Sequence, residues 1–223
     1  MDIRVHHIKT AKTGRYATYG NLSEKTRYLW FCLHGSKMLC EQMLYKFSEF
    51  DADQHFIIAP EGLNRFYQKG FGGDVVASWM TKRDRLEEID DFAGYLSGIY
   101  NLFVDKVQSD CTKIVMGFSQ GGTTAYRWMH HSSVQANLLI GYATWIPEDI
   151  DLQTAKTNFS EMKLLYTYGK NDQFLNQTRI AALNSVIEKN KLDVLWEPYD
   201  GEHRIEKKQL MHIANKYIAI TTS

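Results

Sequence analysis

The amino-acid sequence predicts an α/β fold in which helices flank a mostly parallel central sheet. Short apolar runs alternate along the chain with longer stretches of helical periodicity, a pattern typical of βαβ crossovers. Several short runs are apolar throughout, as in strands that are buried on both faces. Since no linker or repeat divides the 223 residues, we predict a single domain over residues 1–223.

The N-terminal elements begin with two strands. Residues 3–10 and 15–20 lie on either side of Lys12-Thr13-Gly14 and predict an antiparallel hairpin at the edge of the sheet. Residues 28–33 are aromatic and apolar throughout, which predicts a buried strand. Apolar residues with helical spacing predict a helix over 40–47, and the apolar run 55–59, ended by Pro60, predicts the next strand.

Residues 61–81 differ from the rest of the chain. The segment follows a strand end, contains several glycines and aromatic residues, and has weak periodicity. Long loops of this kind tend to be functional or mobile, so we expect a substrate-binding loop here. A merely decorative insertion is the alternative. A phosphate-binding loop at Gly70-Phe71-Gly72-Gly73 is disfavoured, because the Gly-Lys-Ser/Thr ending is missing.

The central elements alternate regularly. Apolar residues with helical spacing predict a long helix over 86–103, and the apolar run 113–116 predicts a strand. Residues 123–129 have the character of a helix. The uncharged run 138–142 predicts the strand that follows it.

The C-terminal elements continue the alternation. Residues 163–168 and 193–197 predict two further strands. Between them, Leu175, Ile180 and their neighbours predict a helix over 175–189, and similar spacing predicts a last helix over 211–218.

The composition is that of an ordinary globular protein. Apolar residues make up 44% and charged residues 23%, which excludes a disordered chain. Lys+Arg and Asp+Glu are both 26, whereas a nucleic-acid-binding protein usually has a basic excess. We therefore expect no nucleic-acid partner. The three cysteines are odd in number and fit no zinc spacing, so we expect reduced, mostly buried thiols.

The sequence contains no apolar stretch close to the ~20 residues that a membrane-spanning helix needs. Met1-Asp2-Ile3-Arg4 leads into no apolar run, so we expect no signal peptide. We predict a cytoplasmic protein with no membrane span, and a homodimer is compatible with the sequence.

The main chemical signal is Gly117-Phe118-Ser119-Gln120-Gly121, followed by Gly122. A predicted strand precedes this motif and a predicted helix follows it, which is the strand-turn-helix context that an exposed serine nucleophile requires. The helix N-terminus would stabilise negative charge beside Ser119. An ordinary serine in a glycine-rich turn is the alternative interpretation.

A serine nucleophile needs a base and an orienting acid. Of the eight histidines, His203 lies in a loop after the last predicted strand, which opens at the carboxyl end of the sheet. Asp172 directly follows the predicted strand 163–168 and lies between serine and histidine in chain order. Capping of the following helix is the alternative role for Asp172. The rival acids are Asp149, Asp151 and Asp200.

An acyl-transfer site also needs donors for the developing oxyanion. The backbone N–H of Gln120, next to the nucleophile, and that of Ser36, after the strand 28–33, are the candidates. Aromatic residues could line an apolar acyl or alcohol site, although plain core packing is the alternative for each. The candidates are Phe66, Tyr67, Phe71, Trp79 and Trp145.

Together these motifs resemble the α/β-hydrolase fold and, within it, the phospholipase/carboxylesterase family of serine hydrolases, which includes acyl-protein thioesterases. The matching segments, in chain order, are Leu33-His34-Gly35, Ala59-Pro60-Glu61-Gly62, Ser78-Trp79, Gly117-Phe118-Ser119-Gln120-Gly121-Gly122, Tyr168-Gly169-Lys170-Asn171-Asp172 and Gly201-Glu202-His203. The chain departs from the family pattern at Glu202, which precedes the histidine, and at residues 63–67, which replace a proline-rich substrate loop.

The resemblance implies Ser119 as nucleophile, His203 as base and Asp172 as acid. It also implies Ser36 and Gln120 as oxyanion donors, with no metal and no organic cofactor. We therefore expect a carboxylic-ester hydrolase that cleaves a small or medium acyl ester through an acyl-enzyme. The alternatives are a thioesterase acting on acylated protein or acyl thiols, and a non-catalytic hydrolase fold used for binding.

Overall fold

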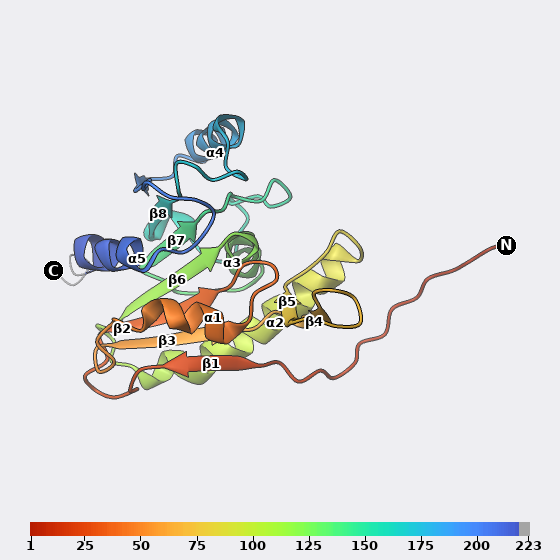
Figure 1. Ribbon diagram of the computed structural model, residues 1–223, viewed down its shortest axis with the longest axis horizontal. Helices are drawn as coiled ribbons and strands as arrows, with labels where there is room; N and C mark the ends of the chain where they lie inside the picture. The colour runs from red at the N-terminus through yellow and green to blue at the C-terminus, as the bar shows by residue number, and fades with distance from the viewer. Residues whose placement is uncertain (219–223) are drawn as a thin grey trace.

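Seven strands form one mixed sheet in the order β1-β3-β2-β6-β7-β8-β9 in the computed structural model, which describes residues 1–218 (Figure 1). All neighbouring strands are parallel except β1, which runs antiparallel to β3. The strands are β1 (Tyr16–Tyr19), β2 (Tyr28–Leu33), β3 (His55–Pro60), β6 (Thr112–Phe118), β7 (Leu138–Tyr142), β8 (Lys163–Thr167) and β9 (Val194–Trp196). The predicted α/β fold with a mostly parallel sheet is confirmed.

Helices cover both faces of this sheet. They are α1 (Cys40–Leu44), α2 (Arg85–Phe103), α3 (Gln120–His131), α4 (Gln177–Lys189) and α5 (Lys207–Ile213). One apolar core lies between the sheet and α2, α3 and α4, and a second lies between the sheet and α1 and α5. Alternate residues of β2 enter the two cores, with Phe31 in the first and Trp30 in the second, as the two-residue period of a strand requires.

The predicted N-terminal hairpin is wrong. The antiparallel edge strand is present as β1, but its partner is β3, and residues 1–15 form no strand. Figure 1 shows this N-terminal segment leading away from the body of the molecule. The side chains of Ile3, Val5 and Ile8 are largely exposed. A strand needs a neighbour for its backbone hydrogen bonds, and the local pattern of residues 3–10 could not reveal that none of the strands within residues 1–218 lies beside it.

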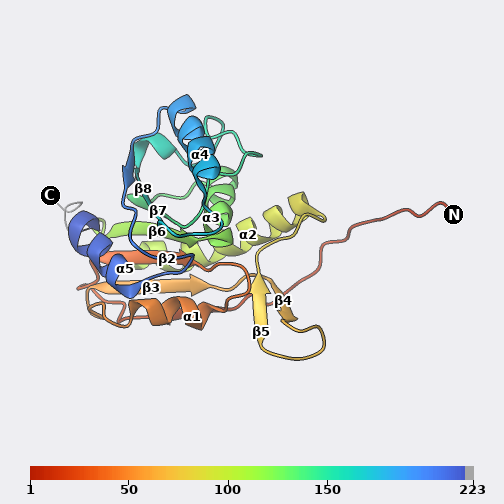
Figure 2. The same ribbon diagram turned by 45° about the horizontal axis from the view of Figure 1, so that its top comes forward.

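The segment 61–81 also differs from the expectation of an irregular loop. It contains β4 (Asn64–Tyr67) and β5 (Val75–Ser78), which pair antiparallel as a separate two-stranded sheet. Gly70 and Gly73 have φ angles of 76° and 84° in the connection, a region that favours glycine. Figure 2 shows the hairpin at the end of the sheet toward which the arrow of β3 points.

The remaining predicted strands and helices are present close to their predicted positions. The principal extensions are in β6, which reaches Phe118, and in α3, which begins at Gln120. None of the helices in residues 1–218 has the length and apolar character to cross a membrane. Because the parallel strands end at the same edge, the loops that follow β2, β6, β8 and β9 gather there.

Candidate active site

Ser119 occupies a strained turn between β6 and α3. Its φ and ψ angles are 52° and −119°, an unusual conformation for a residue with a side chain. Its backbone N–H donates to the carbonyl of Tyr142 (2.9 Å), and its own carbonyl accepts from the hydroxyl of Thr144 (2.8 Å). These bonds hold the strained backbone from two sides.

Glycines make this sharp turn sterically possible. A Cβ added at Gly121 would lie 2.2 Å from the carbonyl oxygen of Leu33, and one at Gly117 would lie 2.4 Å from the Cα of Gly122. Neither distance is compatible with a side chain. The motif's glycines therefore allow α3 to approach β2 and β6 closely, which brings Ser119 to the carboxyl edge of the sheet.

The structure brings Ser119, His203 and Asp172 together. The Oγ atom of Ser119 lies 2.9 Å from Nε2 of His203, and Nδ1 of His203 lies 2.6 Å from Oδ2 of Asp172. Because an ionised carboxylate only accepts, Nδ1–H donates to Asp172 and Nε2 is free to accept the serine proton. The side chain of Asp172 is fully buried, and that of His203 is 15% exposed.

Backbone hydrogen bonds orient the carboxylate of Asp172. Its Oδ1 atom accepts from the N–H groups of Phe174 (2.7 Å) and Leu175 (3.2 Å), which leaves Oδ2 to the histidine. The helix-capping alternative does not hold, because the side chain of Asn176 caps α4.

The rival acids have other roles or positions. Asp149 forms an ion pair with Arg127, and Asp151 accepts a hydrogen bond from the backbone of Gln153 in a turn. The carboxylate that contacts His203 is that of Asp172, not that of Asp200.

Two phenylalanines that the sequence analysis did not single out flank the ring of His203. The ring centroid of Phe118 is 5.1 Å away, and that of the largely exposed Phe174 is 4.7 Å away in an edge-on arrangement. The available signals were that Phe118 lies inside the glycine motif and that Phe174 is two residues beyond Asp172.

The two expected oxyanion donors are free to donate. The backbone N–H groups of Ser36 and Gln120 have no hydrogen-bond partner among residues 1–218. Gln120 is the first residue of α3, where backbone N–H groups lack intrahelical partners. The positive end of the α3 dipole lies at the same place and favours an anion.

Hydrogen bonds link the segments that carry these donors. The Gln120 carboxamide oxygen accepts from the Ser78 hydroxyl (3.1 Å) and the Trp79 N–H (3.2 Å), and its Nε2 donates to the Met80 carbonyl (2.8 Å). The indole N–H of Trp79 donates to the carbonyl of His34 (2.8 Å), two residues before Ser36. The Gln120 side chain is thus connected through Trp79 to the loop after β2.

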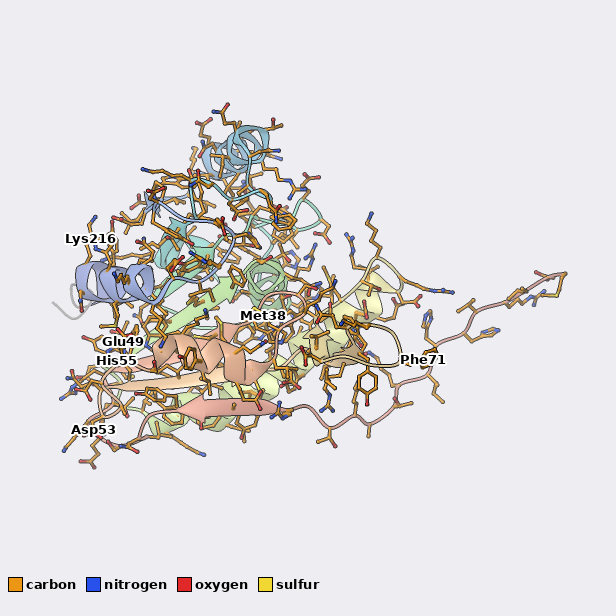
Figure 3. All side chains as sticks on the ribbon, in the orientation of Figure 1. Met38, Glu49, Asp53, His55, Phe71 and Lys216 are labelled. Carbon is orange, nitrogen blue, oxygen red and sulfur yellow. The ribbon has the colours of Figure 1, made fainter. Side chains whose placement is uncertain are left out.

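The expected aromatic residues have different surroundings. Trp79 is buried in the core, with its ring 4.9 Å from that of His34. Phe66 and Tyr67 lie on β4 and are partly exposed, and Phe71 is fully exposed in the hairpin connection (Figure 3). Of the five candidates, only Trp145 lines the cavity of about 670 Å³ that contains Ser119.

Outside this site, liganding atoms come together at Cys40, Glu41 and Glu61. Arg15 occupies this cluster, because its guanidinium donates to both carboxylates. Burial and the neighbouring carboxylates raise the pKa of the Cys40 thiol to about 12, so the thiol is protonated. The cluster is accounted for by the ion pairs of Arg15.

Comparison with known proteins places this geometry in a family context. The sequence model described as Phospholipase/Carboxylesterase matches residues 49–222. No curated protein sequence matches the chain.

Solved structures show the same fold at low sequence identity. Acyl-protein thioesterase 2 of Zea mays superposes with a TM-score of 0.70 and 18% identity over 95% of this chain and 100% of that one. YahD, solved with malic acid, gives 0.68 and 18% over 94% and 100%. The Bacillus cereus carboxylesterase gives 0.67 and 12% over 92% and 94%.

Proposed function

We propose that this chain, which belongs to the phospholipase/carboxylesterase family, hydrolyses a small or medium acyl ester by nucleophilic attack of Ser119. The observation that carries this proposal is the continuous contact from Ser119 Oγ through the His203 ring to the Asp172 carboxylate, at 2.9 and 2.6 Å. A non-catalytic binding module has no need of such an alignment.

In the proposed mechanism, His203 removes the proton of Ser119 through Nε2 as the hydroxyl oxygen attacks the acyl carbonyl. Asp172 holds the imidazole in the required tautomer and stabilises the imidazolium that forms. His203 then gives the proton to the leaving alcohol, which leaves an acyl-enzyme on Ser119. Water, activated by the same ring, cleaves this intermediate and restores the serine.

The free N–H groups of Ser36 and Gln120 are the proposed donors to the oxyanion of the tetrahedral intermediate. The strained backbone of Ser119 presents Oγ at the start of α3. The helix N-terminus adds favourable electrostatics for the same negative charge.

The cavity of about 670 Å³ beside Ser119 supports a substrate with a small or medium acyl group. The residues are equally suited to an acyl thioester, which has the same reacting carbonyl. Matched oxygen and sulfur esters of one acyl chain discriminate between these substrates by their relative kcat/KM.

The test is hydrolysis of 4-nitrophenyl esters from acetate to dodecanoate by wild type and Ser119→Ala. Replacement of the nucleophile is expected to lower kcat/KM at least about a thousandfold, while far-UV circular dichroism stays unchanged. Ser160→Ala is the matched control, because this exposed serine lies in the short 3-10 helix before β8, outside the cavity that contains Ser119. A Ser119→Ala variant that turns over as fast as the wild type contradicts the proposal.

A further inference from the structure

The cavity beside Ser119 has a charged wall. Thr123 and Arg127 lie one and two turns after Ser119 on α3, and both line the cavity. The lining includes Arg85, Ser119, Thr123, Arg127, Glu148 and Asp149. Four of these side chains are ionisable and belong to three separate segments of the chain.

Arg127 is fixed in this wall. Its side chain is only 7% exposed, and its Nε and Nη2 atoms donate to the two carboxylate oxygens of Asp149 at 3.2 and 2.7 Å. Nη1 also donates to the carbonyl of Thr123. A buried guanidinium held in a two-pronged pair has little freedom to reorient.

Arg85, by contrast, keeps its donors free. Its Nη1 atom is 3.7 Å from Oδ2 of Asp149. The Arg85 side chain forms no hydrogen bond in the part of the chain that the structure describes. Its side chain is 38% exposed at the first residue of α2. Two guanidinium groups therefore share one carboxylate, which leaves an excess of positive charge on this side of the cavity.

Glu148 is the remaining charged residue of the lining. It is exposed and has no ion pair with another residue of 1–218. Its carboxylate disfavours an anion at its own position, so within this lining an anion is favoured at the guanidinium of Arg85.

We propose that this cavity binds a carboxylate group carried by the ester substrate, and that Arg85 is the specificity-determining residue that receives it. The planar guanidinium offers paired N–H donors that match a carboxylate. A long alkyl chain is disfavoured in the same cavity, because it would displace water from charged groups without replacing their hydrogen bonds. This inference rests on the proposed function, since it assigns the substrate class of that site.

The test compares substrates that differ only in charge. Mono-4-nitrophenyl adipate carries a carboxylate where 4-nitrophenyl hexanoate has a methyl group, which examines the acyl part. The pair 4-acetoxybenzoate and 4-acetoxybenzamide examines the alcohol part. The measured quantity is the ratio of kcat/KM for the anionic ester to that for its neutral partner.

In at least one pair, Arg85→Gln is expected to lower this ratio about tenfold, because a charge-assisted hydrogen bond is lost. Glu148→Gln is expected to raise the ratio, and NaCl at about 0.5 M to lower it in the wild type. Arg83→Gln, on an exposed residue two positions away that does not line the cavity, is the matched control and should leave the ratio unchanged.

The outcomes separate this inference from the function on which it rests. An active wild type whose ratio is the same in Arg85→Gln in both pairs overturns the carboxylate site and leaves ester hydrolysis standing. A wild type that is inactive on all four esters contradicts both. A wild type that prefers the neutral ester of each pair points to an apolar substrate and also overturns the inference.

Discussion

At the scale of single residues, three histidines have different tasks because their ring nitrogens have different partners. His203 lies between a hydroxyl and a carboxylate. The Nε2 atom of His34 accepts from the N–H of Gly62 at 2.9 Å, and its burial lowers its pKa, so it stays neutral and joins two loops. His55 accepts from the indole N–H of Trp30 at 3.1 Å. It lies at the opposite end of the sheet from the β4–β5 hairpin (Figure 3).

His55 makes the stability of the protein sensitive to acid. Burial lowers its pKa from 6.5 to about 4, so the folded state favours the neutral ring. This contribution to stability is fully present above pH 6.5 and is lost as the pH falls toward about 4. Between these values, we expect the free energy of unfolding of the wild type to fall by about 2 kcal/mol more than that of His55→Gln.

Urea unfolding at several pH values, followed by tryptophan fluorescence, measures this difference. His6→Gln, on an exposed residue of the N-terminal segment, is the control and should follow the wild-type profile. Parallel profiles for wild type and His55→Gln would show that the ring does not resist protonation.

The link between Trp79 and His34 is expected to act on catalysis through the position of the Ser36 N–H. Trp79→Phe keeps an aromatic ring in the core but removes the donor to the His34 carbonyl. Because an oxyanion contact matters mainly in the transition state, we expect kcat for a 4-nitrophenyl ester to fall about tenfold and KM to change less than about twofold.

Trp196→Phe is the matched control. The ring of Trp196, in β9, packs on Tyr166, in β8, and these strands lie away from the loop after β2. This variant should leave kcat unchanged. A Trp79→Phe variant that changes KM but not kcat would show that Trp79 acts on substrate binding instead.

At the scale of elements, the turn from β6 to α3 and the middle of α2 use glycine for opposite reasons. A methyl group added at Gly121 would collide with the backbone of Leu33, at the end of β2, and with that of His34, the next residue. Gly94 and Gly98 lie on the exposed side of α2, where an added Cβ meets no atom within 4 Å. The first glycine is required by packing, and the other two only add chain entropy to the unfolded state.

These contacts predict opposite effects of the same substitution. Gly121→Ala is expected to lower the free energy of unfolding by at least about 2 kcal/mol, because its Cβ would meet a carbonyl oxygen at 2.2 Å. Gly94→Ala is expected to raise it by about 0.5–1 kcal/mol, through the higher helix propensity of alanine. Urea titrations of the two variants measure both values, and equal effects would contradict this account.

At the scale of the whole molecule, the N-terminal segment contributes little to the folded body. The polar contacts of residues 1–9 with α2 and with Asp84, which precedes it, are exposed: His7 with Asp84 and Lys9 with Asp91. Exposed pairs are worth about 0–1 kcal/mol each. The next ion pairs along the chain are those of Arg15, which directly precedes β1, with Glu41 and with the buried Glu61.

Removal of residues 1–8 is therefore expected to lower the free energy of unfolding by less than about 1 kcal/mol, because only the His7 pair is lost. Arg15→Gln in the full chain should cost more, since it leaves the buried carboxylate of Glu61 with only the more distant Arg65, at 4.0 Å. Urea unfolding at pH 7 measures both. A loss of several kcal/mol on truncation would show that residues 3–8 are part of a sheet after all.

The sequence is sufficient to predict the α/β architecture, because burial on both faces and helical periodicity are local properties of β2, β6, β7 and α2. It also predicted that Ser119, Asp172 and His203 would meet, because each follows a strand whose carboxyl end lies at one edge of the sheet. The distances support that prediction, and their catalytic roles stay predictions for the variants to test.

Features that depend on partners far along the chain could be established only from the folded structure. Residues 3–10 have the pattern of a strand but pair with none of the strands in the described part of the chain, and Trp79 packs in the core instead of lining the cavity that contains Ser119. The wall formed by Arg85, Arg127 and Asp149 has no sequence motif, because its members come from two helices and a loop. Local pattern records what a segment can form, whereas a partner's position depends on the packing of the complete fold.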